Sequence, residues 1–214
     1  AAGHLEVNNG DSSTVNFRDL RNEKGVGSYN QPLNNTTTLV YDLPYGKGRK
    51  FGSSANAWAN GIAGGWRLTW INTMTSGPSV NLNWSQPSQF SVTGYPTYRP
   101  NLTGDPMAPV SQRSIDNYFN SANVQLPTDT RFPFGNAGRN IVRGYSFHNL
   151  DMGLHKDFPV WTEGRRIEFR GEFFHLFNRT NFGAPNSTRS ASAFGTIRGT
   201  WPARIIQLAL KFVF

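Results

Sequence analysis

Alternating apolar and polar side chains mark the last ten residues of the chain. The apolar members of residues 205–214 stand at every second position and are Ile206, Leu208, Leu210, Phe212 and Phe214. Between them stand Gln207, Ala209, Lys211 and Val213. Because successive side chains of a β-strand point to opposite faces, this pattern predicts a strand with one apolar and one wetter face. At about 3.3 Å per residue and a tilt of about 45°, ten residues rise roughly 23 Å, close to the apolar height that a membrane-crossing strand must span.

Four earlier segments repeat this alternation, at residues 37–43, 65–75, 149–158 and 166–177. In the last of them Ile167, Phe169, Gly171, Phe173 and Phe177 share one face, while Arg166, Glu168, Arg170 and Glu172 share the other. Four charges in strict alternation need water, because a dry core cannot solvate them. Elsewhere the predicted apolar faces carry Leu39, Tyr41 and Leu43; Trp66, Leu68, Trp70 and Met74; and Leu150, Met152, Leu154 and Phe158. The five segments predict a sheet that is apolar on one face and solvated on the other.

Residues 149–158 and 166–177 are separated by a short turn and predict a hairpin. One register places Leu154 beside Phe169, and it also brings together the like charges of Asp151 and Glu172. In that register Leu150 lies near Phe173, Asp157 faces Arg166 and His155 faces Glu168. A shift by two residues preserves the facing of every side chain and removes the repulsion, so both registers remain open.

Short and long connections alternate along the chain, as the turns and outer loops of outer-membrane barrels do. Residues 1–35 are expected to form an outer loop region, and residues 36–214 the barrel strands, with a long loop at 76–145 and the closing strand at 205–214. The long loop contains a possible helix at 114–122, or it hides a hairpin between 79–84 and 89–93. About five strands can be counted, whereas the smallest barrels have about eight. We therefore expect an all-β fold, an antiparallel transmembrane β-barrel fragment of about five strands, incomplete as a barrel, with long extracellular loops.

Composition narrows the class of protein further. The 214 residues are 37% hydrophobic and carry 22 Gly and 16 Phe, and no apolar run approaches the roughly 18 residues of a membrane helix. The formal net charge is +8, yet apart from Lys47, Arg49 and Lys50 the basic residues are scattered, which disfavours nucleic acid as a partner. The absence of cysteine removes disulfides and thiolate chemistry but does not identify the compartment.

Candidate chemistry is weak throughout. The four histidines, His4, His148, His155 and His175, lack metal-ligand spacing, and the run of residues 46–52 matches no phosphate-binding fingerprint, so a basic turn near anionic headgroups is the better interpretation. The carboxylates Asp151, Asp157, Glu168 and Glu172 favour a solvated ion-pair ladder over an acid–base site. Aromatic side chains in the long loop could stack on a ligand or pack the loop upon itself. No catalytic residue, cofactor or metal is therefore expected, and the chain is not expected to be an enzyme.

Several stretches resemble the C-terminal part of TonB-dependent outer-membrane receptors, specifically the Oar-like group whose barrel accompanies a carboxypeptidase-regulatory-like domain. They are residues 41–49 (YDLPYGKGR), 64–66 (GGW), 99–101 (RPN), 134–140 (FGNAGRN), 173–183 (FFHLFNRTNFG) and the closing strand. The alternating apolar residues that end in Phe214 look like the insertion signal that the barrel-assembly machinery reads. The resemblance covers most of residues 36–214.

The resemblance implies a barrel of about 22 strands, plugged by a domain that engages an energy-coupling inner-membrane complex. We expect an integral protein of the outer membrane of a Gram-negative bacterium, in which this chain completes the barrel wall. Its expected partners are then outer-membrane lipid, the barrel-assembly machinery, and the rest of the barrel and the plug, which are missing from this chain. In this interpretation Gln207 and Lys211 of the last strand line the lumen together with Arg166, Glu168, Arg170 and Glu172. A soluble or surface β-sandwich that binds carbohydrate and a small self-contained outer-membrane barrel remain as alternatives.

Overall fold

The computed structural model describes residues 16, 19–86, 97–129, 131–160 and 164–214. The chain divides into two compact units, each assembled from separate stretches of sequence. One unit comprises Leu33–Thr75, Phe147–Thr180 and Pro202–Phe214, and we call it the sheet unit. The described parts of Ala1–Pro32, together with Ser76–Ser146 and Asn181–Trp201, form the other, which we call the loop unit.

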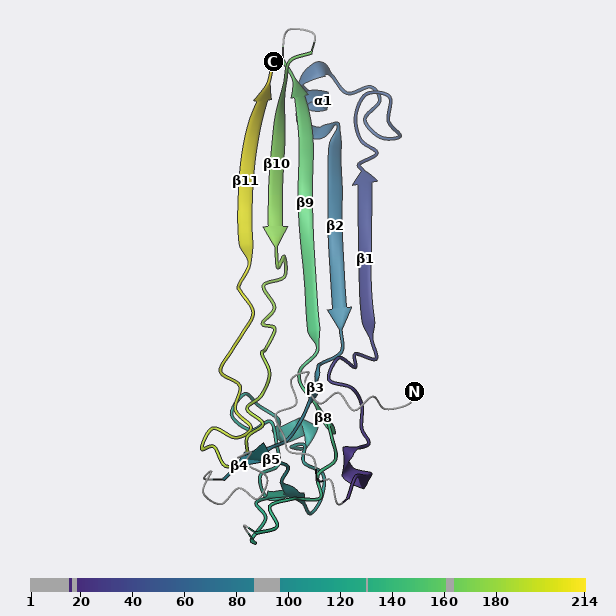
Figure 1. The fold of residues 1–214 in the computed structure, drawn as a ribbon. Coiled ribbons are helices and arrows are strands. Elements are labelled where there is room, and N and C mark those ends of the chain that lie inside the picture. The colour runs from purple at the N-terminus through teal and green to yellow at the C-terminus, as the bar shows by residue number, and fades with distance from the viewer. Residues whose placement is uncertain (1–15, 17–18, 87–96, 130, 161–163) are drawn as a thin grey trace. The chain divides into compact units, whose positions relative to one another are not determined.

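The sheet unit contains one five-stranded antiparallel sheet with the order β1-β2-β9-β10-β11 (Figure 1). Its strands are β1 (Asn34–Asp42), β2 (Trp66–Thr75), β9 (Phe147–Pro159), β10 (Arg166–Phe174) and β11 (Ile205–Val213). Their lengths of 9 to 13 residues suit strands that cross a bilayer. Among the described residues β1 and β11 each pair on one side only, so the sheet does not close. The expected all-β, antiparallel and incomplete architecture is confirmed.

The connection from β1 to β2 folds into a tight turn followed by the helix α1 (Ala57–Ala63). Asn56 begins this helix, because its side chain accepts a hydrogen bond from the amide of Ala59 at 2.8 Å. Gly46 has a φ of +123°, and a Cβ there would lie 2.9 Å from the Cα of Gly64. The turn and the end of α1 therefore pack so closely that glycine is required at both positions.

The register between β9 and β10 is the one shifted by two residues. Leu154 pairs with Gly171, Phe173 with Met152, and Glu172 with Gly153, so Asp151 and Glu172 are not opposed. The first register, with Leu154 beside Phe169, is therefore wrong in the pairing of individual residues. Asp157 likewise lies opposite Glu168 instead of Arg166, and His155 lies opposite Arg170. Side chains keep their predicted faces because a shift of two preserves the period of a strand.

Short paired segments organise the loop unit. They form three two-stranded pairs: β3 (Ser79–Val80) with β8 (Val142–Arg143), β4 (Trp84–Ser85) with β5 (Thr97–Tyr98), and β6 (Asn101–Leu102) with β7 (Val124–Gln125). Two 3-10 turns, Arg21–Glu23 and Val110–Gln112, complete its described regular elements. Of the hairpin predicted between 79–84 and 89–93, residues 89–93 lie outside the described residues. The expected division of the chain at residue 35 stays a prediction.

The loop unit has its own hydrophobic core. Its buried members are Leu82, Tyr118, Phe119, Val124, Val142 and Ile197. Phe119 stacks on Phe194 with ring centroids 5.3 Å apart, and Tyr118 packs against Tyr145 at 4.8 Å. These residues come from segments more than a hundred positions apart, so burial of aromatic surface holds the connections of the loop unit together.

The helix predicted at residues 114–122 is wrong. Tyr118 instead donates its backbone N–H to Gly195 at 2.9 Å and accepts from Ala108 at 3.2 Å, and Phe119 forms an isolated bridge with Met107. A local turn forms where the hydroxyl of Ser114 accepts the amide of Asn117 at 3.1 Å. Ile115, Tyr118 and Phe119 suggested a helical face, but partners distant in the sequence satisfy this backbone.

Candidate membrane-facing wall

The apolar face of the five-stranded sheet is continuous across all its strands. Two lateral rows follow from the register: Leu39, Trp70, Met152, Phe173 and Ile206, and next to it Tyr41, Leu68, Leu154, Gly171 and Leu208. Leu210 lies beside Phe169, and Phe212 lies beside Ile167. The alternate apolar residues of the closing segment thus share one face with the apolar residues of four other strands.

This apolar face is exposed. Leu208 retains 69% of its accessible surface and Leu210 retains 73%. All the fully buried hydrophobic residues among the described positions belong to the loop unit, and none lies on the sheet. Exposed apolar patches of this extent are rare on soluble monomers and mark a surface that contacts lipid or another protein.

Charged and hydroxyl side chains occupy the opposite, polar face. One row contains Asp42, Arg67, His155, Arg170 and Ala209, and a second contains Val40, Thr69, Gly153, Glu172 and Gln207. Glu168 lies opposite Lys211 on one side, and Arg166 lies opposite Val213. The six residues expected to line a lumen therefore share this face, although the aqueous channel itself stays a prediction.

Ion pairs run both along and across the strands of the polar face. Arg166 Nη2 lies 2.8 Å from Glu168 Oε1, and Lys211 Nζ lies 3.8 Å from Glu168 Oε2. Toward the other edge, Arg67 Nε donates to Asp42 Oδ1 at 2.7 Å. The expected ladder is therefore formed in part: Arg166 contacts Asp157 and Glu168, whereas Asp151 accepts the backbone N–H of His175 at 3.0 Å.

One charged side chain lies on the apolar face, and the sequence pattern failed to single it out. Lys156 pairs with Trp66 on one side and Phe169 on the other, and it is buried. Its Nζ donates to the carbonyl of Ile62 at 2.9 Å and to that of Gly64. Lys156 stands at an even-numbered position, like Leu154 and Phe158, and this alternation was the signal that places it on the apolar face.

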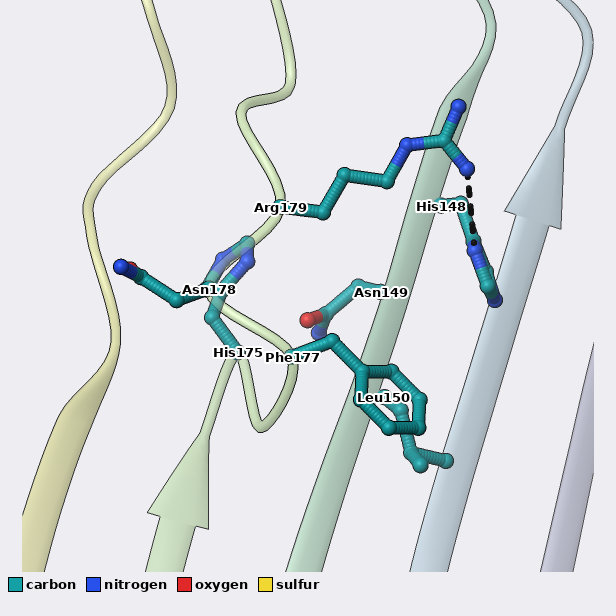
Figure 2. A pocket seen from close by; sticks show the side chains of 7 residues that line it. All are labelled: His148, Asn149, Leu150, His175, Phe177, Asn178 and Arg179. Carbon is teal, nitrogen blue, oxygen red and sulfur yellow. Dashed lines mark hydrogen bonds between the residues drawn. The ribbon is translucent and has the colours of Figure 1, made fainter.

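A shallow hollow lies where β9 begins and the chain leaves β10 (Figure 2). His148, His175 and Arg179 contribute to its lining, and Arg179 reaches the ring of His148 at 3.5 Å. His148 also contacts Asn72 Oδ1 at 3.0 Å. The hollow has room for about one water molecule, whose centre can move within about 10 Å³, and it is therefore too small for a substrate. No cluster of metal-ligating side chains occurs within the described residues, and His4 lies outside them.

Several aromatic residues of the long loop are buried instead of displayed. Trp84 and Tyr98 have ring centroids 5.8 Å apart, and Tyr98 contacts Phe134 at 5.5 Å. Tyr98 and Phe119 retain at most 1% of their accessible surface. These rings pack the loop unit, and of the two interpretations this supports self-packing. Phe90 and Tyr95 lie outside the described residues.

Two carboxylates of the loop unit are each held by an arginine two residues later in the sequence. Arg21 hydrogen-bonds both carboxylate oxygens of Asp19 at 2.8 Å and lowers the pKa of Asp19 to about 2. Hydrogen bonds from Arg131 similarly lower the pKa of Asp129. Neither pair forms a cluster that points to catalysis.

Within the described part of the chain, no helix is long and apolar enough to cross a membrane.

Comparison with known proteins yields one match. A family model described as an outer membrane beta barrel domain matches residues 2–207, which is nearly the whole chain. No curated protein matches, and no solved structure matches.

Proposed function

We propose that this chain, which belongs to the outer membrane beta barrel domain family, is the C-terminal part of a TonB-dependent, Oar-like receptor or transporter. Family membership makes this an outer-membrane β-barrel protein. The receptor class, the Oar-like group and a role in transport are the proposal. In it, the chain completes the barrel wall, presents outer loops and performs no catalysis.

The observation that carries the proposal is an exposed apolar face on a sheet whose two edge strands have no further partner strand among the described residues. A five-stranded sheet that buries neither its apolar face nor its edge strands is not a self-sufficient globule. Acyl chains cover such a face without cost, and further strands of the same barrel pair with β1 and β11. The soluble β-sandwich predicts a second sheet packed on the first, and the described part of the sheet unit contains only one.

Charges on the polar face support a water-filled interior. Barrel interiors in outer membranes are polar, and lateral pairs such as Arg67 with Asp42 suit a solvated wall. The motifs in residues 41–49 and 173–183 support the Oar-like assignment by resemblance. A large barrel of this kind would be plugged by a separate domain that engages the energy-coupling inner-membrane complex.

The proposal also assigns a role to the closing strand. Residues Leu208, Leu210, Phe212 and Phe214 would be read by the barrel-assembly machinery during insertion, and β11 would then pair with the first strand of the complete barrel. Phe214 is suited to such a contact because 93% of its surface is exposed. Its ring stacks on that of Phe212 with centroids 6.0 Å apart, which presents two aromatic rings together.

The size of the mature polypeptide tests the receptor assignment. Outer membranes are prepared from cells that make the protein, and peptides of residues 166–213 are used to identify the polypeptide that carries them. We expect a chain several times heavier than the 23.9 kDa of this sequence, folded in detergent and heat-modifiable on a gel. A folded polypeptide of about this mass would instead support the small self-contained barrel, and a chain folded in plain buffer would support the soluble module.

Transport is tested separately from barrel assembly. In the proposal, binding of the ligand survives when the inner-membrane energy complex is deleted, and uptake does not. Uptake that continues unchanged in the deletion strain, with the barrel present at normal abundance, would contradict TonB dependence. A general porin would behave in that way.

A further inference from the structure

The short helix α1 presents large apolar side chains to its surroundings. Trp58 retains 84% of its accessible surface and Ile62 retains 69%. Residues four apart in a helix lie on the same side, so these two form one exposed apolar strip. Within the described residues no side chain of the sheet unit covers this strip.

Two residues of the apolar face hold the end of α1. Trp66 Nε1 donates to the carbonyl of Ile62 at 2.8 Å, and Lys156 Nζ donates to the same oxygen at 2.9 Å. Since Trp66 and Lys156 are lateral neighbours on that face, the last turn of α1 lies on the apolar side of β2 and β9. Figure 1 shows α1 beside the ends of these strands.

Lys156 is a positioning residue in this arrangement. Its ammonium lies 5.1 Å from the ring centroid of Trp66 and 4.9 Å from that of Phe158. A buried ammonium needs acceptors, and the carbonyls at the end of a helix supply them while the helix dipole favours the charge. The lysine therefore fixes α1 at the place where the apolar face ends.

A cationic turn is attached to the same helix. Lys47, Arg49 and Lys50 supply three positive charges, and residues 43–65 contain no aspartate or glutamate. The amide of Lys47 donates to Asn60 Oδ1 of α1 at 2.6 Å, which links the turn to the helix. Asp42, just before this range, feels the charge of Arg49 but is already bound by Arg67. An apolar strip beside cations in excess of their counter-charges is complementary to anionic headgroups above acyl chains.

We propose that α1 and residues 44–52 form an interfacial anchor that binds the anionic leaflet at the end of the sheet where β11 finishes. Trp58 and Ile62 enter the acyl boundary, and Lys47, Arg49 and Lys50 pair with phospholipid phosphates. This inference rests on the proposed function in one respect, since it requires the apolar face of the sheet to contact lipid. It adds a specific lipid-binding element that the barrel wall itself does not need.

Spin labelling tests the anchor, because the chain contains no cysteine of its own. The whole protein is reconstituted in vesicles of phosphatidylethanolamine and phosphatidylglycerol with one label at Trp58→Cys, Leu208→Cys, Lys211→Cys or Ser54→Cys. Oxygen, which enters the bilayer, and a water-soluble nickel chelate then compete to relax each label. We expect oxygen to dominate at positions 58 and 208, and the chelate to dominate at 211 and 54.

Two further variants separate the parts of the anchor. In Lys47→Gln/Arg49→Gln/Lys50→Gln, the label at position 58 should shift toward the chelate in vesicles that contain phosphatidylglycerol and remain unchanged in pure phosphatidylcholine. In Lys156→Met, the same label should gain mobility while the label at 208 keeps its depth. If Lys156→Met changes the labels at both 58 and 208, the substitution has disturbed the folding of the wall. The variant without the three cations then decides whether the anchor exists.

The outcomes distinguish this inference from the proposed function. A label at 58 as accessible to the chelate as the one at 54, with a lipid-exposed label at 208, overturns the anchor and leaves the wall intact. Chelate access at both 58 and 208 overturns the wall as well. Equal depth at 58 with and without the three cations would overturn the headgroup pairing.

Discussion

Asp157 on β9 and Glu168 on β10 lie directly opposite each other, and Arg166 holds both carboxylates. Arg166 Nη2 lies 2.8 Å from Glu168 Oε1, and Arg166 Nε lies 4.0 Å from Asp157 Oδ2. Like charges in directly opposed positions destabilise a sheet. The arginine, with help from Lys211, makes this register tolerable.

Removal of that arginine should weaken the pairing of β9 with β10. We expect Arg166→Gln to lower the free energy of unfolding by about 0.5 to 1 kcal/mol, because the two opposed carboxylates then face each other with less compensation. The measurement is urea-induced unfolding in lipid vesicles. Arg165→Gln, an adjacent exposed position, is the matched control. Equal effects of both variants would mean that the bridge contributes nothing.

Arginine on the apolar face should block membrane insertion. Phe169→Arg and Leu208→Arg each place a charge against acyl chains, at a cost of about 2 to 4 kcal/mol near the midplane. We expect loss of heat-modifiable, protease-resistant protein from the outer membrane. Glu168→Gln and Lys211→Gln, on the opposite face of the same strands, should have much smaller effects. Equal tolerance at the two pairs of sites would reverse the assignment of the faces.

The loop unit depends on a buried ion pair between Glu23 and Arg99. Both side chains are almost fully buried, so loss of one partner leaves an uncompensated charge. We expect Glu23→Ala to lower the free energy of unfolding of this unit by about 3 to 5 kcal/mol. Tryptophan fluorescence of the loop unit measures the transition. Asp129→Ala breaks an exposed pair with Arg131 and should have a much smaller effect on the same unfolding transition, because solvent screens exposed pairs. Indistinguishable values for the two variants would show that Glu23 is not buried in solution.

High pH should destabilise the loop unit through Tyr118. Burial raises the pKa of its phenol above the usual value, and its Oη donates to the carbonyl of Arg143 at 2.6 Å. The folded state therefore favours the neutral phenol. Its contribution to stability is complete below about pH 10 and is lost as pH rises from there through the raised pKa.

Tyr118→Phe isolates this effect. At neutral pH the variant should lose about 1 kcal/mol of unfolding free energy with the hydrogen bond. Above about pH 10 its stability should fall less steeply than that of the parent protein, since no phenol titrates at this position. Denaturant unfolding on both sides of that pH provides the comparison. Parallel pH profiles would show that Tyr118 ionises freely in the folded chain.

Prediction from the sequence succeeded for the strands and failed for the long connection. Residues 166–177 and 205–214 alternate so regularly that their strands were located to within a few residues. Residues 114–122 have apolar positions that fit a helix, yet Tyr118 and Phe119 are positioned by Gly195 and Phe194, about seventy-five residues later. The parity of Lys156 places it on the apolar face, but its role was not predictable, because its acceptors at Ile62 and Gly64 belong to another part of the chain.

The sequence by itself determined which side chains share a face, because a strand has a period of two that no register shift by two can alter. Tertiary structure decided which residues meet across the strands, since registers with Leu154 beside Phe169 or beside Gly171 present the same faces and differ only in pair energies. It also decided that aromatic rings of the loop unit form a core. That outcome depends on contacts between segments far apart in the sequence, where no local pattern records the partner.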